Sequence, residues 1–323
     1  MNVALVLYEL ARNSHRRQLV WGEEIDALSM QRAFLRRADV SVCEIITMNS
    51  YLALCEAGVT REYDLAIHFY EPSLEIPGAL NVLYFQQFYD LDRHDIGGLC
   101  EIFDRVFTPA RSIAESHSVI GYLPLAVDAD LYRPVLKPAG EYHCDAVFIG
   151  NAPIRDSTTY RELLSPLLRF DVAIYGARWD KPEYHEWTGV WKGVLPIESA
   201  RDAYAGASVA LSIHNQRYRN ELSFVTARPF HSLACGRATV SDTNSALTEL
   251  LPPELSGLRH AADATQFERA VTELLDDEPL RVDLGIQGRE FVLQYHTWDV
   301  RIEQLLNELY GAHSFYTARR PHA

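Results

Sequence analysis

The stretch ALSIHNQRYRNELSFVTARPFHSLACGRATVSD, residues 210–242, predicts a strand, a polar loop, a short helix and a second strand. Its first four residues form a largely apolar run that is typical of a buried strand. Pro229 suits the first turn of a helix, where backbone amides have no intrahelical partner. Gly236 stands where a helix commonly ends, and Ala238 begins the next strand. A helix N-terminus that follows a strand and is flanked by arginines is a favourable site for a phosphate group.

Strands and helices alternate on both sides of this stretch. In the first half, strands are expected at Asn2–Leu7, Val40–Ile46, Asp64–Phe69, Leu80–Phe85 and Arg105–Phe107. In the second half, they are expected at Asp145–Ile149, Val172–Tyr175, Ser208–Ile213 and Ala238–Ser241. Intervening helical segments make this a βαβ rhythm, which predicts parallel, doubly wound sheets with right-handed crossovers.

The length of 323 residues exceeds the commonest size of one domain and predicts two domains. The segment Asp128–His143 interrupts the alternation with two prolines and a glycine, as expected of an inter-domain connection. We therefore expect an N-terminal domain over residues 1–127, a linker over 128–143 and a C-terminal domain over 144–295. Residues 296–323 contain a last amphipathic helix.

The chain is acidic, with a formal net charge of −14 at pH 7. Because such a surface repels phosphate backbones, general nucleic-acid binding and a nucleic-acid acceptor are disfavoured. A predicted strand begins at the second residue, and no apolar run approaches the ~20 residues of a membrane helix. We therefore expect no signal peptide and no membrane span. The five cysteines lack C-x-x-C spacing, which favours reduced core residues in the cytoplasm over a metal site or disulfides.

Several short motifs follow one another from residue 123 to residue 301. They are LPLAVDADLYRP (123–134), DAVFIG (145–150), IYGARW (174–179), GVLPIESARDAY (193–204), LSIH (211–214), ARPFHSLACG (227–236), VSD (240–242) and HTWDVR (296–301). In this order, over roughly residues 123–309, the chain resembles the group 1 glycosyltransferases, specifically their spore-maturation CgeB-like branch. The resemblance implies the GT-B fold, in which two Rossmann-like domains face a central cleft. It also implies that the C-terminal domain holds a nucleotide-sugar donor and that the last helix crosses back to the N-terminal domain.

Transfer from a nucleotide-diphosphate sugar requires groups that neutralise the leaving diphosphate. Arg228 and the amides of Thr226–Arg228 are the first candidates, because guanidinium groups bind phosphate oxygens bidentately. The alternative for Arg228 is a structural ion pair. Arg217 and Arg219 are the next candidates, and solvated loop charges are their equally supported alternative.

Two other loops at strand ends are expected to face the donor. Asn151 and Arg155 follow the first strand of the second half, with a plain turn as the alternative. The resemblance places Tyr175 and Gly176 at the start of a loop that binds the nucleotide base, with core packing as the alternative for Tyr175.

One position departs from the family pattern R-x-F-E-A-x-A-x-G. His231 stands where that pattern has a glutamate, which commonly binds the donor ribose. A histidine donates or accepts a hydrogen bond but lacks the two oxygens of a carboxylate. We therefore expect an altered ribose contact or an unusual donor.

An inverting transferase needs a base that removes the acceptor proton, and the first half would supply it. His68 ends a predicted strand, Glu71 follows it, and Asp90 follows the next strand and its loop. The polar loop at residues 15–17, His-Arg-Arg, is also expected to face the cleft. A histidine at a strand end is more often structural. A retaining enzyme needs no dedicated base, and these residues would then contact the acceptor.

Two further patterns carry weaker predictions. Asp90-Leu91-Asp92 has the D-x-D spacing of metal-binding GT-A enzymes, but it lies outside the donor half, so we expect no metal. Trp179, Tyr184, Trp187 and Trp191 form either a carbohydrate platform or a packed aromatic cluster.

These observations predict a metal-independent glycosyltransferase of the hexosyltransferase type, with no cofactor. Its co-substrate would be a UDP-, GDP- or dTDP-linked sugar, and its acceptor a small molecule, a glycan or a protein. The alternatives are a nucleotide-sugar epimerase or hydrolase of the same fold and a non-catalytic nucleotide-binding member.

Overall fold

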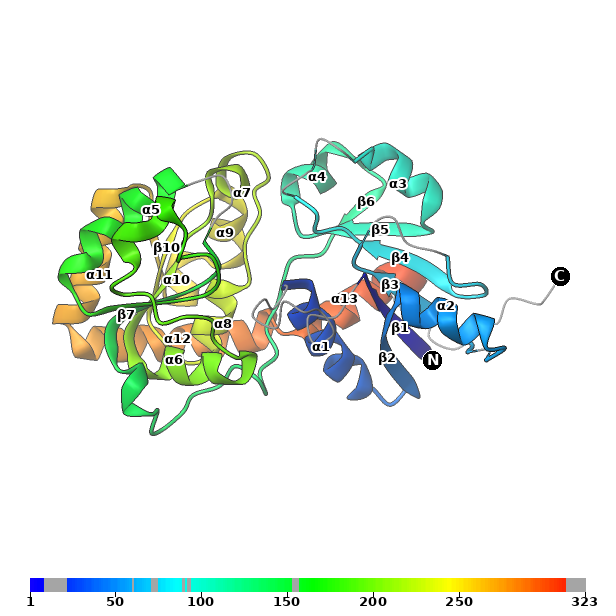
Figure 1. Ribbon diagram of the computed structural model, residues 1–323, viewed down its shortest axis with the longest axis horizontal. Coiled ribbons are helices and arrows are strands. Elements are labelled where there is room, and N and C mark those ends of the chain that lie inside the picture. Colours follow the sequence, from blue (N-terminus) through cyan, green and yellow to red (C-terminus); the bar gives the residue numbers. More distant parts are fainter. Residues whose placement is uncertain are drawn as a thin grey trace.

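The computed structural model describes residues 1–8, 22–59, 61–70, 75–88, 91, 94–152 and 157–311. These residues form two parallel β-sheets, each accompanied by helices (Figure 1). Every pair of neighbouring strands runs parallel, so the predicted α/β class with two Rossmann-like halves is confirmed.

The first sheet has the strand order β2-β1-β3-β4-β5-β6. Its strands are β1 (Asn2–Leu7), β2 (Val42–Thr47), β3 (Leu65–His68), β4 (Leu80–Tyr84), β5 (Arg105–Thr108) and β6 (Ile120–Tyr122). The helices of this half are α1 (Gly22–Leu35), α2 (Met48–Glu56), α3 (Ile96–Ile102) and α4 (Arg111–Ser116). Val3–Leu7 of β1 are all buried, which explains why the sequence of a strand covered on both faces is continuously apolar.

The second sheet has the strand order β11-β10-β9-β7-β8. Its strands are β7 (Cys144–Ile149), β8 (Val172–Tyr175), β9 (Ala207–Ser212), β10 (Thr239–Asp242) and β11 (Leu258–Ala261). The helices of this half are α5 (Ser157–Leu164), α6 (Ala200–Gly206), α7 (Gln216–Asn220), α8 (Arg228–Ala234), α9 (Ser245–Leu250), α10 (Pro253–Ser256), α11 (Ala264–Asp276) and α12 (Glu278–Tyr295).

Three elements of the second half were not predicted. The polar loop at 214–220 contains α7, where Asn215 caps the helix by accepting a hydrogen bond from the amide of Tyr218 at 2.8 Å. Helix α10 and strand β11 were also missed. The four residues LRHA of β11 are too short and too polar for a strand signal, and their conformation depends on pairing with β10.

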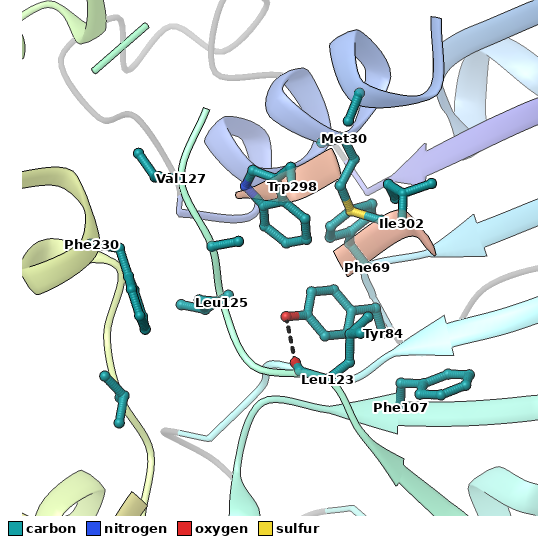
Figure 2. Packing of buried hydrophobic residues seen from close by; sticks show 14 of the residues in the cluster. Met30, Phe69, Tyr84, Phe107, Leu123, Leu125, Val127, Phe230, Trp298 and Ile302 are labelled. Carbon is teal, nitrogen blue, oxygen red and sulfur yellow. Dashed lines mark hydrogen bonds between the residues drawn. The ribbon is translucent and has the colours of Figure 1, made fainter. Parts of the chain in front are cut away.

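The last helix, α13 (Trp298–Tyr310), packs against α1 of the first half. Its Trp298 is buried and meets the ring of Tyr84 edge-on at 6.3 Å, while the Tyr84 hydroxyl donates to the carbonyl of Leu123 at 2.9 Å (Figure 2). Where the chain passes between the halves, the amide of Val127 donates to His296 O, and the amide of Trp298 donates to Val127 O, both at 3.0 Å. The two segments that connect the halves, at Val127 and at residues 296–298, are therefore hydrogen-bonded to each other.

Candidate functional site

The carboxyl ends of β7, β8, β9 and β10 meet at one edge of the second sheet. The register pairs Ile149 with Tyr175, Phe148 with Leu211, and Ser241 with Ser212. Ligands of open α/β sheets bind beyond this edge, so the loops that follow these four strands define the candidate site.

Arg228 in the first turn of α8 extends to this edge. Its guanidinium carbon lies 5.2 Å from the centre of the Phe148 ring, and its Nη2 donates to the carbonyl of Ile213. A Cβ on Gly150 would lie 3.0 Å from its Nη1. The guanidinium thus lies between the ends of β7 and β9. Within the described ranges no carboxylate pairs with Arg228 and its buried Nε has no hydrogen-bond partner, so the alternative of a structural ion pair is not observed.

The loops after β7 and β8 cross at a pair of glycines. Gly176 has a φ of +139°, and a Cβ there would lie 2.1 Å from the carbonyl oxygen of Gly150, so only glycine fits. Asn151 is exposed, and its Oδ1 accepts a hydrogen bond from the amide of Ala177 at 2.8 Å. Both predicted residues therefore shape this edge, and their contact with a donor stays a prediction.

Arg178 is a second cation at this edge, and sequence reasoning missed it. Its φ of +70° is unusual for a residue other than glycine. Its guanidinium donates to the carbonyl of Ala152 at 3.2 Å through Nε and at 3.0 Å through Nη2. A non-glycine residue held at positive φ is often associated with a functional constraint. The signal available in the sequence was its place two residues after Gly176.

A buried His–Asp pair joins β9 to β10, and it too was missed. His214 follows β9 in the sequence, and its Nδ1 lies 2.7 Å from Oδ1 of Asp242 at the end of β10. The amide of Thr226 donates to Nε2 of His214 at 3.3 Å, so the ring proton must be on Nδ1. The amide of His214 also donates to Asp242, at 3.0 Å. This network fixes the loop that precedes Arg228.

The network defines the surroundings of three predicted residues. Thr226 does not cap α8, because Ala227 is the N-cap residue and makes no side-chain capping bond. The Thr226 amide is engaged by His214 instead. Arg219 Nη1 lies 3.7 Å from Asp242 Oδ2, whereas Arg217 Nε lies 3.4 Å from Glu221 Oε2. Binding of the donor by Thr226, Arg217 and Arg219 stays a prediction.

His231 is buried, and its ring stacks on Tyr132 with a 3.7 Å centroid separation and an 8° interplanar angle. Burial, together with the positive charge of Arg228, lowers the pKa of His231 to about 3. The imidazole is therefore neutral at physiological pH. Its stacking partner belongs to the segment predicted as the linker, and contact with a ribose stays a prediction.

Tyr175 is buried beside the ring of Tyr142, at a centroid distance of 6.2 Å. Burial raises the pKa of its hydroxyl to about 12. This arrangement corresponds to the core-packing alternative.

His68 is completely buried. Its Nε2 lies 2.9 Å from Oδ1 of Asn81, its ring centre lies 5.3 Å from that of Phe103, and burial lowers its pKa. This geometry fits the structural alternative for a histidine at a strand end better than an exposed base. Glu71, Asp90, Arg155, Asp92 and residues 15–17 lie outside the described residues.

Asp26 on α1 is a titratable group of the first half that the sequence analysis overlooked. Its side chain is buried and accepts a hydrogen bond at 3.2 Å from Nε2 of Gln86, which follows the carboxyl end of β4. Burial raises the pKa of Asp26 to about 8, and the negative charge of Glu23 adds to the effect. A carboxyl group with such a pKa exchanges its proton near neutral pH.

Three of the four predicted aromatic rings form a packed cluster and not a carbohydrate platform, whereas Trp191 is partly exposed and its indole donates to the carbonyl of Gly176 at 2.8 Å. Trp179 and Trp187 are 0% exposed and Tyr184 is 3% exposed, in a cluster with Phe148. The indole of Trp179 donates to the carbonyl of Gly150 at 2.8 Å, so this ring supports the site from beneath. Rings buried on both faces have no surface left for a sugar.

The two halves touch across the candidate edge. Ala110 forms an antiparallel bridge with Phe224, and the amide of Ser112 donates to Leu222 O at 3.2 Å. Arg111 of α4 pairs with Glu249 of α9, which gives this acid a structural role.

All five cysteines are free thiols. In the part of the chain that the structure describes, no three His, Cys, Asp or Glu side chains group as metal ligands. No helix there combines the length and apolar character needed to cross a membrane.

Comparison with known proteins extends these observations. A family model described as glycosyl transferase-like matches residues 155–307. No curated protein matches the chain. One similar solved structure is sucrose-phosphate synthase from Thermosynechococcus elongatus, with a TM-score of 0.68, 15% identity, and coverage of 96% of this chain and 99% of that chain.

Two further structures show the same likeness. HepE of Anabaena in complex with UDP-glucose has a TM-score of 0.65, 10% identity, and coverage of 96% of this chain and 99% of that one. An alpha-glucosyltransferase in complex with UDP and a 13-mer DNA has a TM-score of 0.67, 12% identity, and coverage of 95% and 98%. At these identities the likeness establishes the fold: the two Rossmann-like halves adopt the GT-B arrangement, as predicted.

Proposed function

We propose that this protein transfers a sugar from a nucleotide-diphosphate sugar to an acceptor. The observation that carries the proposal is Arg228, a cation without a carboxylate partner in the described structure, held between the carboxyl ends of β7 and β9. In the transfer, the bond between the anomeric carbon and the diphosphate oxygen breaks and a bond to an acceptor oxygen forms. The acceptor proton passes to a base or to the leaving phosphate. Arg228 would stabilise the negative charge that develops on the diphosphate.

A UDP-linked sugar is the donor that we propose first, ahead of GDP- and dTDP-linked sugars. Two of the similar structures are described with UDP-glucose or UDP, and the glycosyl transferase-like match covers most of the second half. Because arginine supplies the charge neutralisation, we propose a metal-independent, hexosyltransferase-type reaction in the cytoplasm, within the CgeB-like branch. The net charge of −14 favours a small-molecule, glycan or protein acceptor over DNA.

On the acceptor side, we propose Asp26 as the general base, because its carboxyl lies beside Gln86 at the carboxyl end of β4. Its raised pKa and its hydrogen bond to Gln86 suit proton exchange near neutral pH. An inverting mechanism would use this carboxylate to remove the acceptor proton. A retaining mechanism would leave it with an acceptor-binding role.

The proposal is tested by a thermal-shift panel of UDP-, GDP-, dTDP- and ADP-sugars. A ligand present at one hundred times its Kd adds about 2.7 kcal/mol of stability and raises Tm by several degrees. We expect the rise with a UDP-sugar and its loss in Arg228→Ala. Arg269→Ala, at an exposed position on α11, is the matched control and should respond as the wild type does. A panel in which no nucleotide sugar shifts Tm contradicts the proposal.

A further inference from the structure

A cavity lies at the opposite edge of the second sheet, near the amino ends of β9 and β10. It encloses about 410 Å³, and its lining includes Ser208 at the start of β9 and Ala238 just before β10. The remaining wall comes from the turn after α8, from one side of α12 and from Pro134. Since parallel strands point away from this edge, the cavity is distinct from the candidate donor site.

The lining of this cavity is cationic although the chain is acidic. Arg237, Arg281 and Arg289 line it, and Glu290 is the one carboxylate among its lining residues. Three positive charges against one negative charge make the cavity a local exception in a protein with a net charge of −14. Such a site attracts anions despite the overall repulsion.

None of the three arginines forms an ion pair in the described structure. Each uses Nη1 to donate to a main-chain carbonyl: Arg237 to Ala207 at 3.2 Å, Arg281 to Leu274 at 2.7 Å, and Arg289 to Ala234. A guanidinium carries five N–H donors, so most of its donors remain available. The Nε of Arg237 is buried without a hydrogen-bond partner. Burial lowers the pKa of Arg237, and the nearby Arg281 lowers it further. A bound anion would stabilise the charged guanidinium and so oppose both effects.

The cavity also has an apolar side. Val282 and Ile286 on α12 line it and are 50% and 54% exposed, with Pro134 nearby in the lining. A ligand that filled the cavity would place an anionic group among the arginines and an apolar part over these side chains. Phosphate matches this donor set, because planar guanidinium groups bind its oxygens bidentately.

We propose that this cavity binds an organic phosphate, with its phosphate group held by Arg237, Arg281 and Arg289 and its apolar part packed on Val282 and Ile286. The same chemistry is offered by a free phosphate ester and by the headgroup of an anionic phospholipid. The proposal does not depend on the glycosyltransferase function.

Isothermal titration with phenyl phosphate and with inorganic phosphate tests the proposal. We expect wild-type protein to bind both, and phenyl phosphate more tightly. Arg281→Gln combined with Arg289→Gln should weaken binding by about tenfold or more, the scale of losing charged hydrogen bonds. Arg269→Gln, which removes one arginine charge at an exposed position on α11, should bind as the wild type does. Arg228→Ala should also retain this binding, which separates the cavity from the candidate donor site.

A second, single variant provides an independent test in case the double variant does not fold. Ile286→Glu places a negative charge beside the cavity at a half-exposed position, and we expect it to weaken phosphate binding while Tm changes by only a few degrees. Sedimentation with phosphatidylglycerol vesicles, compared with phosphatidylcholine vesicles, distinguishes a lipid headgroup from a free ester. The proposal is overturned if the wild type binds none of these probes, or if Arg281→Gln/Arg289→Gln and Ile286→Glu both bind them as the wild type does.

Discussion

Nδ1 of His214 lies 2.7 Å from Oδ1 of Asp242, and this contact links the carboxyl ends of β9 and β10. Both residues are buried, and the histidine accepts a hydrogen bond from the Thr226 amide on its other ring nitrogen. The pair therefore sets the position of the chain just before Arg228. Changes to it should alter the candidate site without touching a donor directly.

Asp242→Asn tests this positioning role. The amide keeps an acceptor at Oδ1, but its NH2 group replaces Oδ2, which accepts from the His214 amide at 3.2 Å, and the negative charge that faces both His214 donors is lost. Such a loss costs about 1–3 kcal/mol, measured by urea unfolding. Donor affinity should fall as well. Asp276→Asn, at an exposed position near the end of α11, should change neither quantity. Equal stability of the two variants contradicts the role.

Arg228→Ala tests the candidate donor site. Removing a preorganised charge contact to a developing anion lowers turnover by about 10²-fold or more. The measurement is release of the nucleoside diphosphate in the presence of an acceptor. Arg269→Ala provides the charge-matched control. Unchanged kinetics in Arg228→Ala would remove this residue from the site.

Gly176→Ala tests the crossing of the loops after β7 and β8. A Cβ would overlap the Gly150 carbonyl at 2.1 Å, and the φ of +139° is itself strained for alanine by about 1–3 kcal/mol. We expect a marked loss of stability in urea and loss of donor binding. Gly189→Ala is the matched control, because a Cβ there meets nothing within 4 Å. Similar stability of both variants would show that the loops do not cross in this way.

The contribution of His231 to the stability of the protein should fall as the pH drops from 7 to 5. His231 has a folded-state pKa of about 3 against 6.5 in the unfolded chain, so the unfolded state binds the extra proton. Its contribution is present above pH 6.5 and is lost on acidification, by about 2 kcal/mol at pH 5. His231→Phe keeps the stacking on Tyr132 and removes the titration, so its unfolding free energy should change less over this range. An unaltered pH dependence would mean that His231 is accessible to protons in the folded state.

The ionisation of Asp26 should determine how kcat/KM depends on pH. If its carboxylate is the base, kcat/KM rises through its pKa of about 8, and Asp26→Asn loses that rise. The same substitution should increase stability at pH 8, because the folded state disfavours the charged carboxylate. Glu278→Gln, on the exposed start of α12, is the control. A wild-type pH profile retained by Asp26→Asn assigns the base elsewhere.

The sequence alone predicted most of the architecture, because its signals are local. The apolar runs at 3–7 and 145–149 and the proline–glycine segment after Asp128 indicated two parallel α/β halves. Gly236 was expected just beyond the end of a helix, and it has a φ of +73° immediately after the C-cap residue of α8. Chain order and strand ends were also enough to place Arg228 among the residues of the candidate edge.

Only the tertiary structure decided which of these residues face one another. His214 and Asp242 are 28 residues apart, and Asp26 and Gln86 are 60 apart, so no periodicity reports their contacts. Burial likewise made His68 and Trp179 core residues, because their exposure depends on what covers them. Local pattern fixes strands and helices through backbone preferences, whereas a binding site is assembled from side chains at strand ends that meet only when the sheet forms.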